Sequence, residues 1–460
     1  MLARNNATSN TSVSRSVADA PSRFAPVDPA VASNRTRPKL LLLAWNFPPV
    51  QAIASVRTWN VAKYLTRLGW DVTVVTPKTE LWRNLENVEK ARADLRAEGI
   101  RKISTEHGWR FLSPLHLTCR NDGIGWFAGG VCRRLCSAVG IDDAVGWIKA
   151  AERACDRIRP DEVDLILASG PPFSAFTLAE KLSKKLHRPY ALDYRDPWTV
   201  TDIIPGLQHL TISRERKLLA GAAAVIMVSQ SWAAELNSRF NIGSKLQVVT
   251  NGYDPEELKE VEPHDFGHFA IVYAGIFYPP ERVVTPILDA LKRLDIKGGS
   301  HEWFFHYYGE HNSHVHDEAV RLGISNRVKL HGRVPRSVAL SAIRGANVAL
   351  VITSVSESAP ARITGWVPAK LFEILGVGTP ILLVAPPGCD AQLIADSGGW
   401  SRRFSGNDIT EIVSFIEQQM HGGPVEKRDS HRYAWKEIAV SFDKHLRNHL
   451  PGSTAQAISN

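Results

Sequence analysis

The sequence lacks several features that would define its class at once. It contains no run of about 18 apolar residues, so it predicts no helix that spans a membrane. No Gly-x-Gly-x-x-Gly follows a strand pattern, and neither a Gly-x-Ser-x-Gly elbow nor a P-loop lysine motif occurs. These absences count against a dinucleotide cofactor, an elbow-type serine hydrolase and a P-loop nucleotide hydrolase.

Cysteine is scarce, and the histidines are poorly spaced for a metal. The chain has five cysteines, an odd number without Cys-x-x-Cys spacing, which predicts reduced thiols in a cytoplasmic protein. Several histidines gather in the second half but fit no common zinc pattern: His301, His306, His311, His314 and His316. We therefore expect no metal and no other cofactor.

Length and composition are those of a globular protein with more than one core. At 460 residues the chain exceeds what one hydrophobic core usually supports, so two domains are expected. The net charge of +8 favours anionic ligands or surfaces but does not specify nucleic acid. Residues 1–37, rich in Ser, Asn, Ala and Arg, predict a disordered tail.

Residues 38–252 alternate short apolar strands with helices, and this order predicts a first α/β domain. Lys39–Trp45, Ser55–Leu68 and Asp71–Thr76 read as a βαβ unit with a right-handed crossover. Residues 80–160 are less regular and predict helices that cover one face. Further strands are expected at Val163–Ser169, Pro189–Asp193, Ala223–Val228 and Leu246–Thr250.

An acidic, Pro-containing segment, 253–268, reads as a linker to a second α/β domain over 269–425. Its expected strands are Phe269–Ala274, Trp303–Tyr308, Arg327–Leu330, Asn347–Ile352 and Pro380–Val384. Residues 426–450 hold an amphipathic helix. The predicted fold is α/β, with two doubly wound, Rossmann-like domains that face each other across a cleft.

The stretch 363–384 carries the most informative local pattern. It predicts a helix over about Pro368–Leu375, with Pro in its first turn, Gly376 and Gly378 as the stop, and then a buried strand. Lys370 and Glu373 share one face near the positive end of that helix. They predict a phosphate site with a carboxylate for sugar hydroxyls. The alternative is an ordinary exposed ion pair.

Several stretches, in order, resemble one family. They are LLLAWNFPPV, ASVRTWNVAKYLTRLGWDVTVVT, DLILASGPPFSAF, LDYRDPW, VVTNGYD, IVYAGIFYPPERV and VPAKLFEILGVGTPIL, and they cover most of the chain from Lys39 to about Leu446. The sequence thereby resembles the nucleotide-sugar glycosyltransferases of the GT-B fold, specifically family 4. The resemblance implies that the C-terminal helix returns toward the first domain.

The resemblance assigns donor roles by position. Lys370 matches the lysine on the donor diphosphate, and Glu373 matches the glutamate that binds ribose at the end of a Glu-x7-Glu motif. The first glutamate of that motif would fall at Gly365, and the nearby Glu357 does not keep the spacing. Gly275 matches a glycine beside the phosphates, Arg282 is the candidate second cation, and the base-binding edge falls at Val328, Gly332 and Val334.

The acceptor side is expected at Asn46, Arg57, Arg195 and Asp196, and Gln51–Ala54 replaces two glycines that the family often has. Arg195 and Asp196 follow a strand and either orient the acceptor or form a structural turn before Pro197. Lys370, Arg282 and Asp196 are the candidate catalytic residues. The diphosphate charge is expected to be balanced by cationic side chains rather than by Mg²⁺.

The resulting functional hypothesis is transfer of a sugar from a nucleoside diphosphate donor to a glycan or lipid-linked acceptor in polysaccharide or glycoconjugate biosynthesis. Retention of configuration is implied by the resemblance. Two alternatives remain: a nucleotide-sugar epimerase or phosphorylase on the same scaffold, and a non-catalytic subunit that binds a nucleotide sugar.

Residues 81–134 raise a separate possibility, peripheral binding to the cytoplasmic face of a membrane. The segment holds Trp82, Trp109 and Trp126 among many basic residues, which suit anionic headgroups: Arg83, Arg92, Arg96, Arg101, Lys102, Arg110, Arg120, Arg133 and Arg134. The alternative is solvated helix faces with tryptophans in the core. Sedimentation with anionic liposomes should show salt-sensitive binding, and a protein that stays in the supernatant at low salt would exclude it.

Overall fold

The computed structural model describes residues 37–79, 85, 87–106, 142, 144–199, 208–298, 301–310, 313–422 and 429–451. The chain divides into Met1–Arg37 and a unit spanning Pro38–Asn460, and everything below concerns that second unit. Trp82, Trp109 and Trp126, central to the membrane hypothesis, lie outside the described residues. No helix within those residues has the length and apolar character to cross a bilayer.

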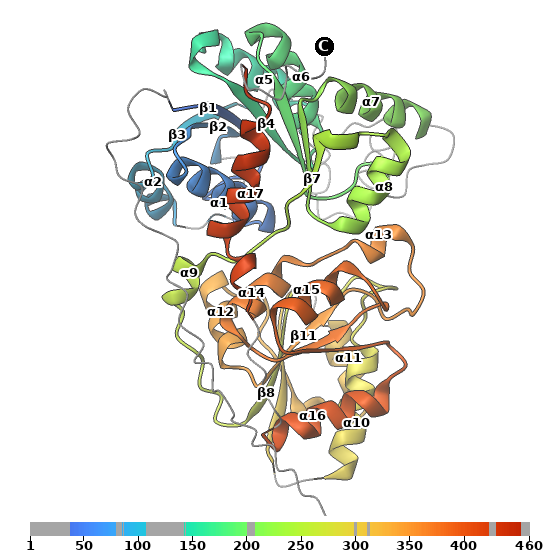
Figure 1. Cartoon of the computed structure of the whole chain (residues 1–460). Helices are drawn as coiled ribbons and strands as arrows, with labels where there is room; N and C mark the ends of the chain where they lie inside the picture. The colour runs from blue at the N-terminus through green and yellow to red at the C-terminus, as the bar shows by residue number, and fades with distance from the viewer. Residues whose placement is uncertain are drawn as a thin grey trace, which may run out of the picture. The chain divides into compact units, whose positions relative to one another are not determined.

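The first half contains a parallel sheet in which seven described strands pair in the order β3-β2-β1-β4-β5-β6-β7 (Figure 1). Its strands are β1 (Lys39–Ala44), β2 (Asp71–Pro77), β3 (Arg101–Thr105), β4 (Leu165–Gly170), β5 (Tyr190–Tyr194), β6 (Ala224–Met227) and β7 (Leu246–Val248). In β1, Leu41 and Leu43 enter the core on one face, while Leu40 and Leu42 enter the core on the other. A strand buried on both faces reads as a continuous apolar run, as observed.

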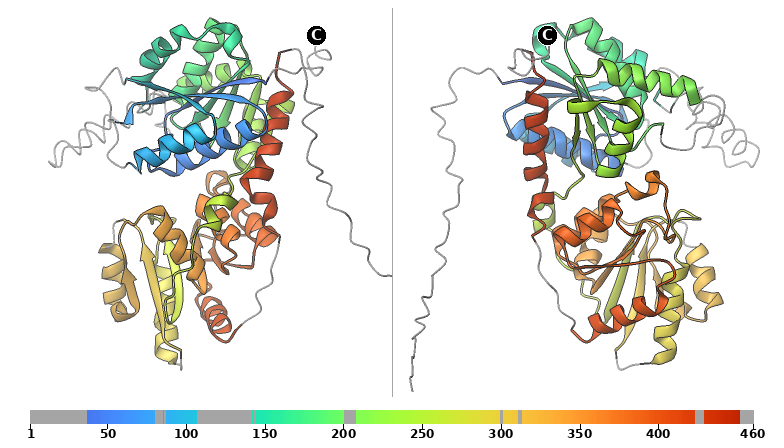
Figure 2. Two further views of the ribbon diagram at one scale, coloured as in Figure 1. Left: turned by 90° about the vertical axis from the view of Figure 1, so that its left-hand side faces the viewer. Right: turned by 45° about the vertical axis from the view of Figure 1, so that its right-hand side comes forward.

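Helices cover both faces of this sheet. One face packs on α5 (Trp147–Ala154), α6 (Ser174–Leu186), α7 (Gln208–Gly221) and α8 (Gln230–Phe240). The other packs on α1 (Ile53–Arg67), α2 (Val88–Ala97) and α17 (Trp435–Arg447). Helix α17 buries Trp435, Ile438 and Phe442 there, so the C-terminal helix returns to the first sheet as predicted (Figure 2).

The second half contains a parallel sheet in which six described strands pair in the order β10-β9-β8-β11-β12-β13. Its strands are β8 (Phe269–Ala274), β9 (Trp303–Tyr308), β10 (Val328–Leu330), β11 (Val348–Ile352), β12 (Ile381–Val384) and β13 (Ser401–Phe404). Helices α10 (Thr285–Lys297), α11 (Ser313–Arg321) and α16 (Ile409–Met420) cover one face. Helices α12 (Arg336–Gly345), α14 (Ala369–Val377) and α15 (Asp390–Gly398) cover the other. The two-sheet α/β prediction is thereby confirmed.

Four details differ from the sequence predictions. Strand β3 lies in a region expected to be helical, and β13 was not expected, because both are short edge strands rich in basic residues that bury few side chains. Pro368 is the N-cap of α14 rather than a residue of its first turn. Gly376 lies inside α14, where a Cβ would approach the Tyr253 ring to 2.6 Å, and Gly378 alone ends the helix.

Candidate functional site

Lys370 stands in the first turn of α14, where backbone N–H groups have no partner within the helix. Its ammonium lies 3.6 Å from the centre of the Tyr273 ring, and none of the described carboxylates forms an ion pair with it. Burial, together with the charge of Arg282, lowers the pKa of Lys370 to about 7. A desolvated ammonium beside a helix N-terminus is a ready anion site.

Gly275 lies directly after β8 and faces Lys370. A Cβ at this position would stand 2.6 Å from Lys370 Nζ, and the φ of +148° is one that side chains rarely adopt. The Gly275 N–H donates to the Tyr308 carbonyl at 2.9 Å, which holds this loop at the end of the sheet. The missing side chain therefore leaves room for a ligand to approach the backbone beside the lysine.

Arg282 supplies a second cation at the same place. Its guanidinium is packed between two rings, 4.2 Å from the centre of Tyr278 and 3.4 Å from that of Trp366. Burial lowers the pKa of Arg282, and its charge in turn opposes protonation of Lys370. Two neighbouring cations without a counter-ion among the described residues fit a ligand that carries more than one negative charge.

Glu373 lies one turn further along α14. It does not form the ordinary exposed ion pair with Lys370 that was the alternative to a phosphate site. Its carboxylate instead accepts a hydrogen bond from Arg336, whose guanidinium is also held by Glu257 at 2.7 and 3.0 Å. Burial opposes the charge of Arg336, but the two carboxylates outweigh it and keep its pKa above the ordinary value. Sequence reasoning missed Arg336 because its partners are 79 and 37 residues away.

The expected base-binding edge lies at the other end of the sheet. Val328 belongs to β10, and Gly332 and Val334 follow it in the loop before α12. Beside this loop is a pocket of about 460 Å³ whose lining includes Tyr308, His331 and Val334. The sheet order therefore places the proposed base edge two strands from β8, the strand that Gly275 follows.

His306, one of the histidines considered for a metal, lies in a hydrogen-bonded chain instead. Its ring nitrogens are 2.9 Å from His268 Nε2 and 3.0 Å from His331 Nε2. Burial lowers the pKa of His306 to about 3, so the ring is neutral. Within the part of the chain that the structure describes, no group of three His, Cys, Asp or Glu residues is arranged to hold a metal, and His311 lies outside it.

Arg57 lies in the interior of the first half. Its guanidinium forms an ion pair with Asp193 at 2.7 Å, and each side chain is only 2% exposed. It also donates to the carbonyls of Val249 and Thr250 and to the Asn251 side chain. Arg57 thus ties β5 to the segment that follows β7, and every contact named here is internal.

Arg195 and Asp196 follow β5, and Asn46 follows β1, the second neighbour of β5 in the sheet. Arg195 donates to the Pro171 carbonyl, and burial lowers its pKa to about 10. Asp196 lies on the surface, but its surroundings desolvate the carboxyl and raise its pKa to about 6. A carboxyl with that pKa can exchange protons near neutral pH.

Gly365, where the first motif glutamate would stand, has no room for a side chain. A Cβ there would be 2.3 Å from Cδ1 of Trp232, whose indole N–H donates to the Arg362 carbonyl at 3.0 Å. Because an indole ring cannot yield by rotation of a flexible end, glutamate and Trp232 exclude each other in this arrangement. The departure from the motif is therefore built into the packing.

The comparisons with known proteins agree with this architecture. Residues 54–257 match the family model described as Glycosyltransferase Family 4. No curated protein matches the chain. Among solved structures, sucrose-phosphate synthase from Thermosynechococcus elongatus has a TM-score of 0.56 at 13% identity, covering 90% of this chain and 95% of that one.

Two further structures share the fold. Anabaena HepE in complex with UDP has a TM-score of 0.54 at 15% identity and covers 89% of this chain and 100% of its own. The lipopolysaccharide outer core galactosyltransferase WaaB, in its apo form, has a TM-score of 0.51 at 14% identity, covering 90% and 100%. At these identities the likeness shows the fold alone.

Two parallel Rossmann-like sheets, with a C-terminal helix that packs on the first, are the architecture of the GT-B fold. The match to the model of glycosyltransferase family 4 covers residues 54–257, in the first half of the chain.

Proposed function

We propose that the protein is a glycosyltransferase that uses a nucleotide sugar as its donor. The diphosphate of that donor would bind at the N-terminus of α14, between Lys370 and Arg282, with the ribose on Glu373. The observation that carries this proposal is the Lys370 ammonium, which is desolvated yet has no carboxylate partner in the described part of the chain. A dianionic ligand would supply the missing charge and restore the ordinary protonation of the lysine. The open space at Gly275 leaves room for this ligand.

A uridine nucleotide is the first donor to test. HepE has been crystallised with UDP, and also with UDP and glucose, and it shares the fold of this chain over about nine tenths of its length. The base would lie against the loop that contains Gly332 and Val334. Val328 is 9% exposed and would support that loop from below rather than touch the base.

The leaving diphosphate would be stabilised without a metal ion. Lys370 and Arg282 bring two positive charges, and the first turn of α14 adds unpaired N–H groups that point at the same place. Retention of anomeric configuration rests on the family. Trp232 stands where the side chain of the first motif glutamate would begin, so a glutamate at position 365 takes no part in this site.

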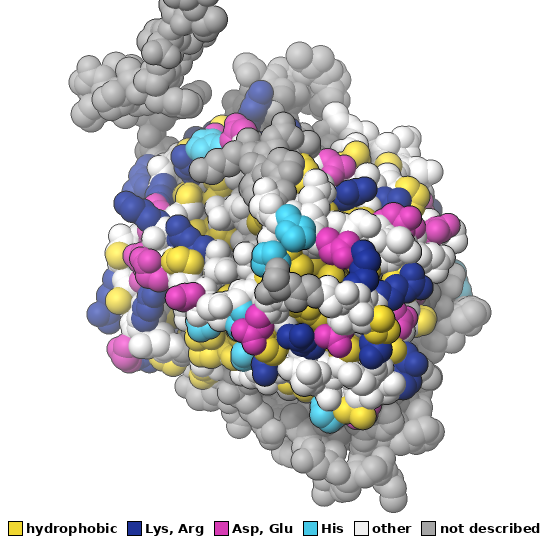
Figure 3. Space-filling view, turned by 90° about the horizontal axis from the view of Figure 1, so that it is seen from below, with side chains coloured by type: hydrophobic (Ala, Val, Ile, Leu, Met, Phe, Trp, Pro, Cys, Tyr) yellow, Lys and Arg dark blue, Asp and Glu magenta, His cyan; other side chains and the backbone are white. Residues whose placement is uncertain are grey.

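The acceptor would be a glycan or a lipid-linked sugar, approaching from the first half of the chain. Asn46, Arg195 and Asp196 stand at strand ends there, and Asp196 can accept a proton near neutral pH. The proposal of a membrane-bound acceptor rests on residues 81–134 alone. Among the basic residues of that segment, Arg92 forms an ion pair with Glu89 at 2.9 Å. Among the described residues on the face shown in Figure 3, basic and acidic side chains are interspersed.

The test is a diphosphate-release assay with UDP-, GDP- and ADP-sugars, in the presence and absence of a mixture of glycan acceptors. We expect release that depends on the acceptor and that survives exhaustive treatment with EDTA. Interconversion of donor sugars without an acceptor would indicate an epimerase, and binding without turnover would indicate a non-catalytic subunit. Activity lost to EDTA and restored by a divalent ion would contradict the metal-free mechanism.

A further inference from the structure

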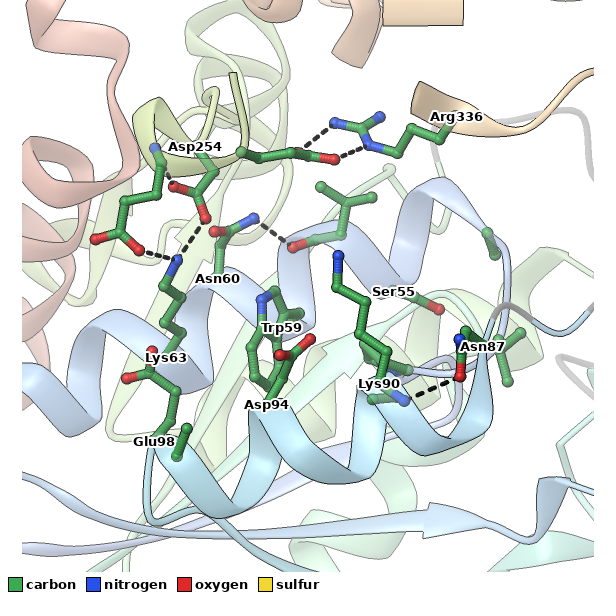
Figure 4. A pocket seen from close by; sticks show the side chains of 18 of the residues that line it. Ser55, Trp59, Asn60, Lys63, Asn87, Lys90, Asp94, Glu98, Asp254 and Arg336 are labelled. Carbon is green, nitrogen blue, oxygen red and sulfur yellow. Dashed lines mark hydrogen bonds and ion pairs between the residues drawn. The ribbon is translucent and has the colours of Figure 1, made fainter. Parts of the chain in front are cut away.

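A second cavity, of about 430 Å³, lies in the first half of the chain (Figure 4). Helices α1 and α2 form its walls, and α9 (Pro255–Lys259) closes one end. Cavities that bind small molecules usually measure about 300–1,000 Å³, so this one is large enough for one or two sugar rings. None of the donor residues proposed above lines it.

The lining combines an aromatic ring with polar groups that have no partner. Trp59 of α1 is half-buried, with its ring edge-on to Phe47 at 6.2 Å between centres. The indole N–H of Trp59, the ammonium of Lys90 and the carboxylate of Asp94 form no hydrogen bond with any described residue, and all three side chains are seen in the cavity in Figure 4. Donors and an acceptor are thus available beside an apolar ring.

Asn60, one residue further along α1, adds an independent observation. It is 2% exposed, its side-chain N–H donates to the Val56 carbonyl at 2.9 Å, and its Oδ1 atom has no partner. A buried amide oxygen without a hydrogen bond is costly and rare in folded proteins. A hydroxyl group or a water held by a ligand in this cavity would satisfy it.

Most of the remaining charged groups of the wall are already paired. Lys63 binds Asp254 at 2.7 Å and Glu256 at 2.8 Å, and Arg336 binds Glu257. The lining holds six carboxylates against three cations, so it repels phosphate and other anions. A neutral polyhydroxyl compound fits both the surplus of acceptors and the ring of Trp59.

We propose that this cavity binds a neutral saccharide, the sugar portion of the acceptor that lies beyond the reacting unit. The proposal rests on the proposed function, because the cavity adjoins that site at two points. Its rim includes Pro48, Val50 and Ala52, in the loop that begins after β1 at Asn46. It also includes Arg336, whose other contact is Glu373. A saccharide held here would reach from the acceptor loop toward the donor carboxylate.

The test uses the full chain and saturation-transfer NMR with maltose, cellobiose and lactose, with glucose 6-phosphate as the anionic comparison. We expect at least one neutral disaccharide to bind, and Trp59→Ala to weaken it by about tenfold or more, whereas Trp59→Phe should retain most of the affinity. Because Trp59 contributes to packing, Asp94→Asn and Lys90→Ala serve as surface variants and should each weaken binding several-fold. Thermal unfolding confirms that each variant is folded.

Three results would overturn the proposal. They are the absence of binding by all three disaccharides, equal binding to the wild type and the folded Trp59 and Asp94 variants, and a preference for the phosphorylated sugar. Acceptor-independent hydrolysis of a nucleotide sugar separates this inference from the proposed function. That activity needs no acceptor and therefore reports on the donor site alone, and saccharide binding would persist even if no nucleotide sugar were turned over.

Discussion

Lys370→Ala is expected to lower the turnover number by about 100- to 1,000-fold, the usual effect of removing one preorganised group from a developing negative charge. The diphosphate carries its largest charge as it leaves, and Lys370 is the cation in the first turn of α14. Steady-state kinetics with the best donor from the nucleotide-sugar panel measure the effect. KM should change much less than kcat.

The same lysine predicts a pH dependence. With its pKa lowered to about 7, Lys370 is charged below pH 7 in the free protein and increasingly neutral above it. A bound diphosphate favours the charged form, so binding takes up a proton above pH 7. The dissociation constant of a nucleoside diphosphate should therefore rise about tenfold per pH unit above 7, and calorimetry in two buffers of different ionisation enthalpy should detect the proton.

Glu373→Ala is the matched comparison on the same helix. Loss of a charge-assisted hydrogen bond to ribose should weaken nucleotide binding by roughly 1–3 kcal/mol, with a smaller change in kcat. Since Arg336 then loses one of its two carboxylates, unfolding of the variant must be checked in parallel. Wild-type kinetics in folded Lys370→Ala and Glu373→Ala proteins would refute the donor site.

The second large effect is on stability. Arg57→Ala leaves Asp193 as an uncompensated charge in the interior, where each partner of the pair is 2% exposed. Removing one partner of a buried ion pair costs about 3–5 kcal/mol, and here the carbonyls of Val249 and Thr250 lose a donor as well. We expect the free energy of unfolding to fall by that amount, measured by urea denaturation monitored by circular dichroism.

The control is the double variant Arg57→Met with Asp193→Asn, which removes both charges. It should recover part of the lost stability, because no buried charge remains unpaired. Lys63→Ala provides a further comparison for the free energy of unfolding. Lys63 pairs with Asp254 and with the more exposed Glu256. An Arg57→Ala protein as stable as the wild type but unable to use an acceptor would instead show that Arg57 contacts ligand.

Much of the architecture follows from the sequence alone. Continuous apolar runs such as Leu40–Ala44 predict strands buried on both faces, and the helices between them require a parallel sheet. Lys370 and Glu373, the proposed donor residues, could be placed on one face because they lie in one turn of one helix, where spacing fixes their direction. The edge strands β3 and β13 escaped prediction because they are rich in basic residues and bury only one residue each, which leaves no apolar pattern in the sequence.

Only the tertiary structure decided which charged side chains are available to a ligand and which are paired inside the fold. Arg57 looked like a ligand contact, but Asp193, 136 residues away, makes it part of the interior. Arg336 carried no motif, yet it joins Glu257 to Glu373. Spacing along a helix constrains neighbours a turn apart. The partner of a charge that lies many residues away is set by how strands and helices pack, and so are the burial and pKa of that charge.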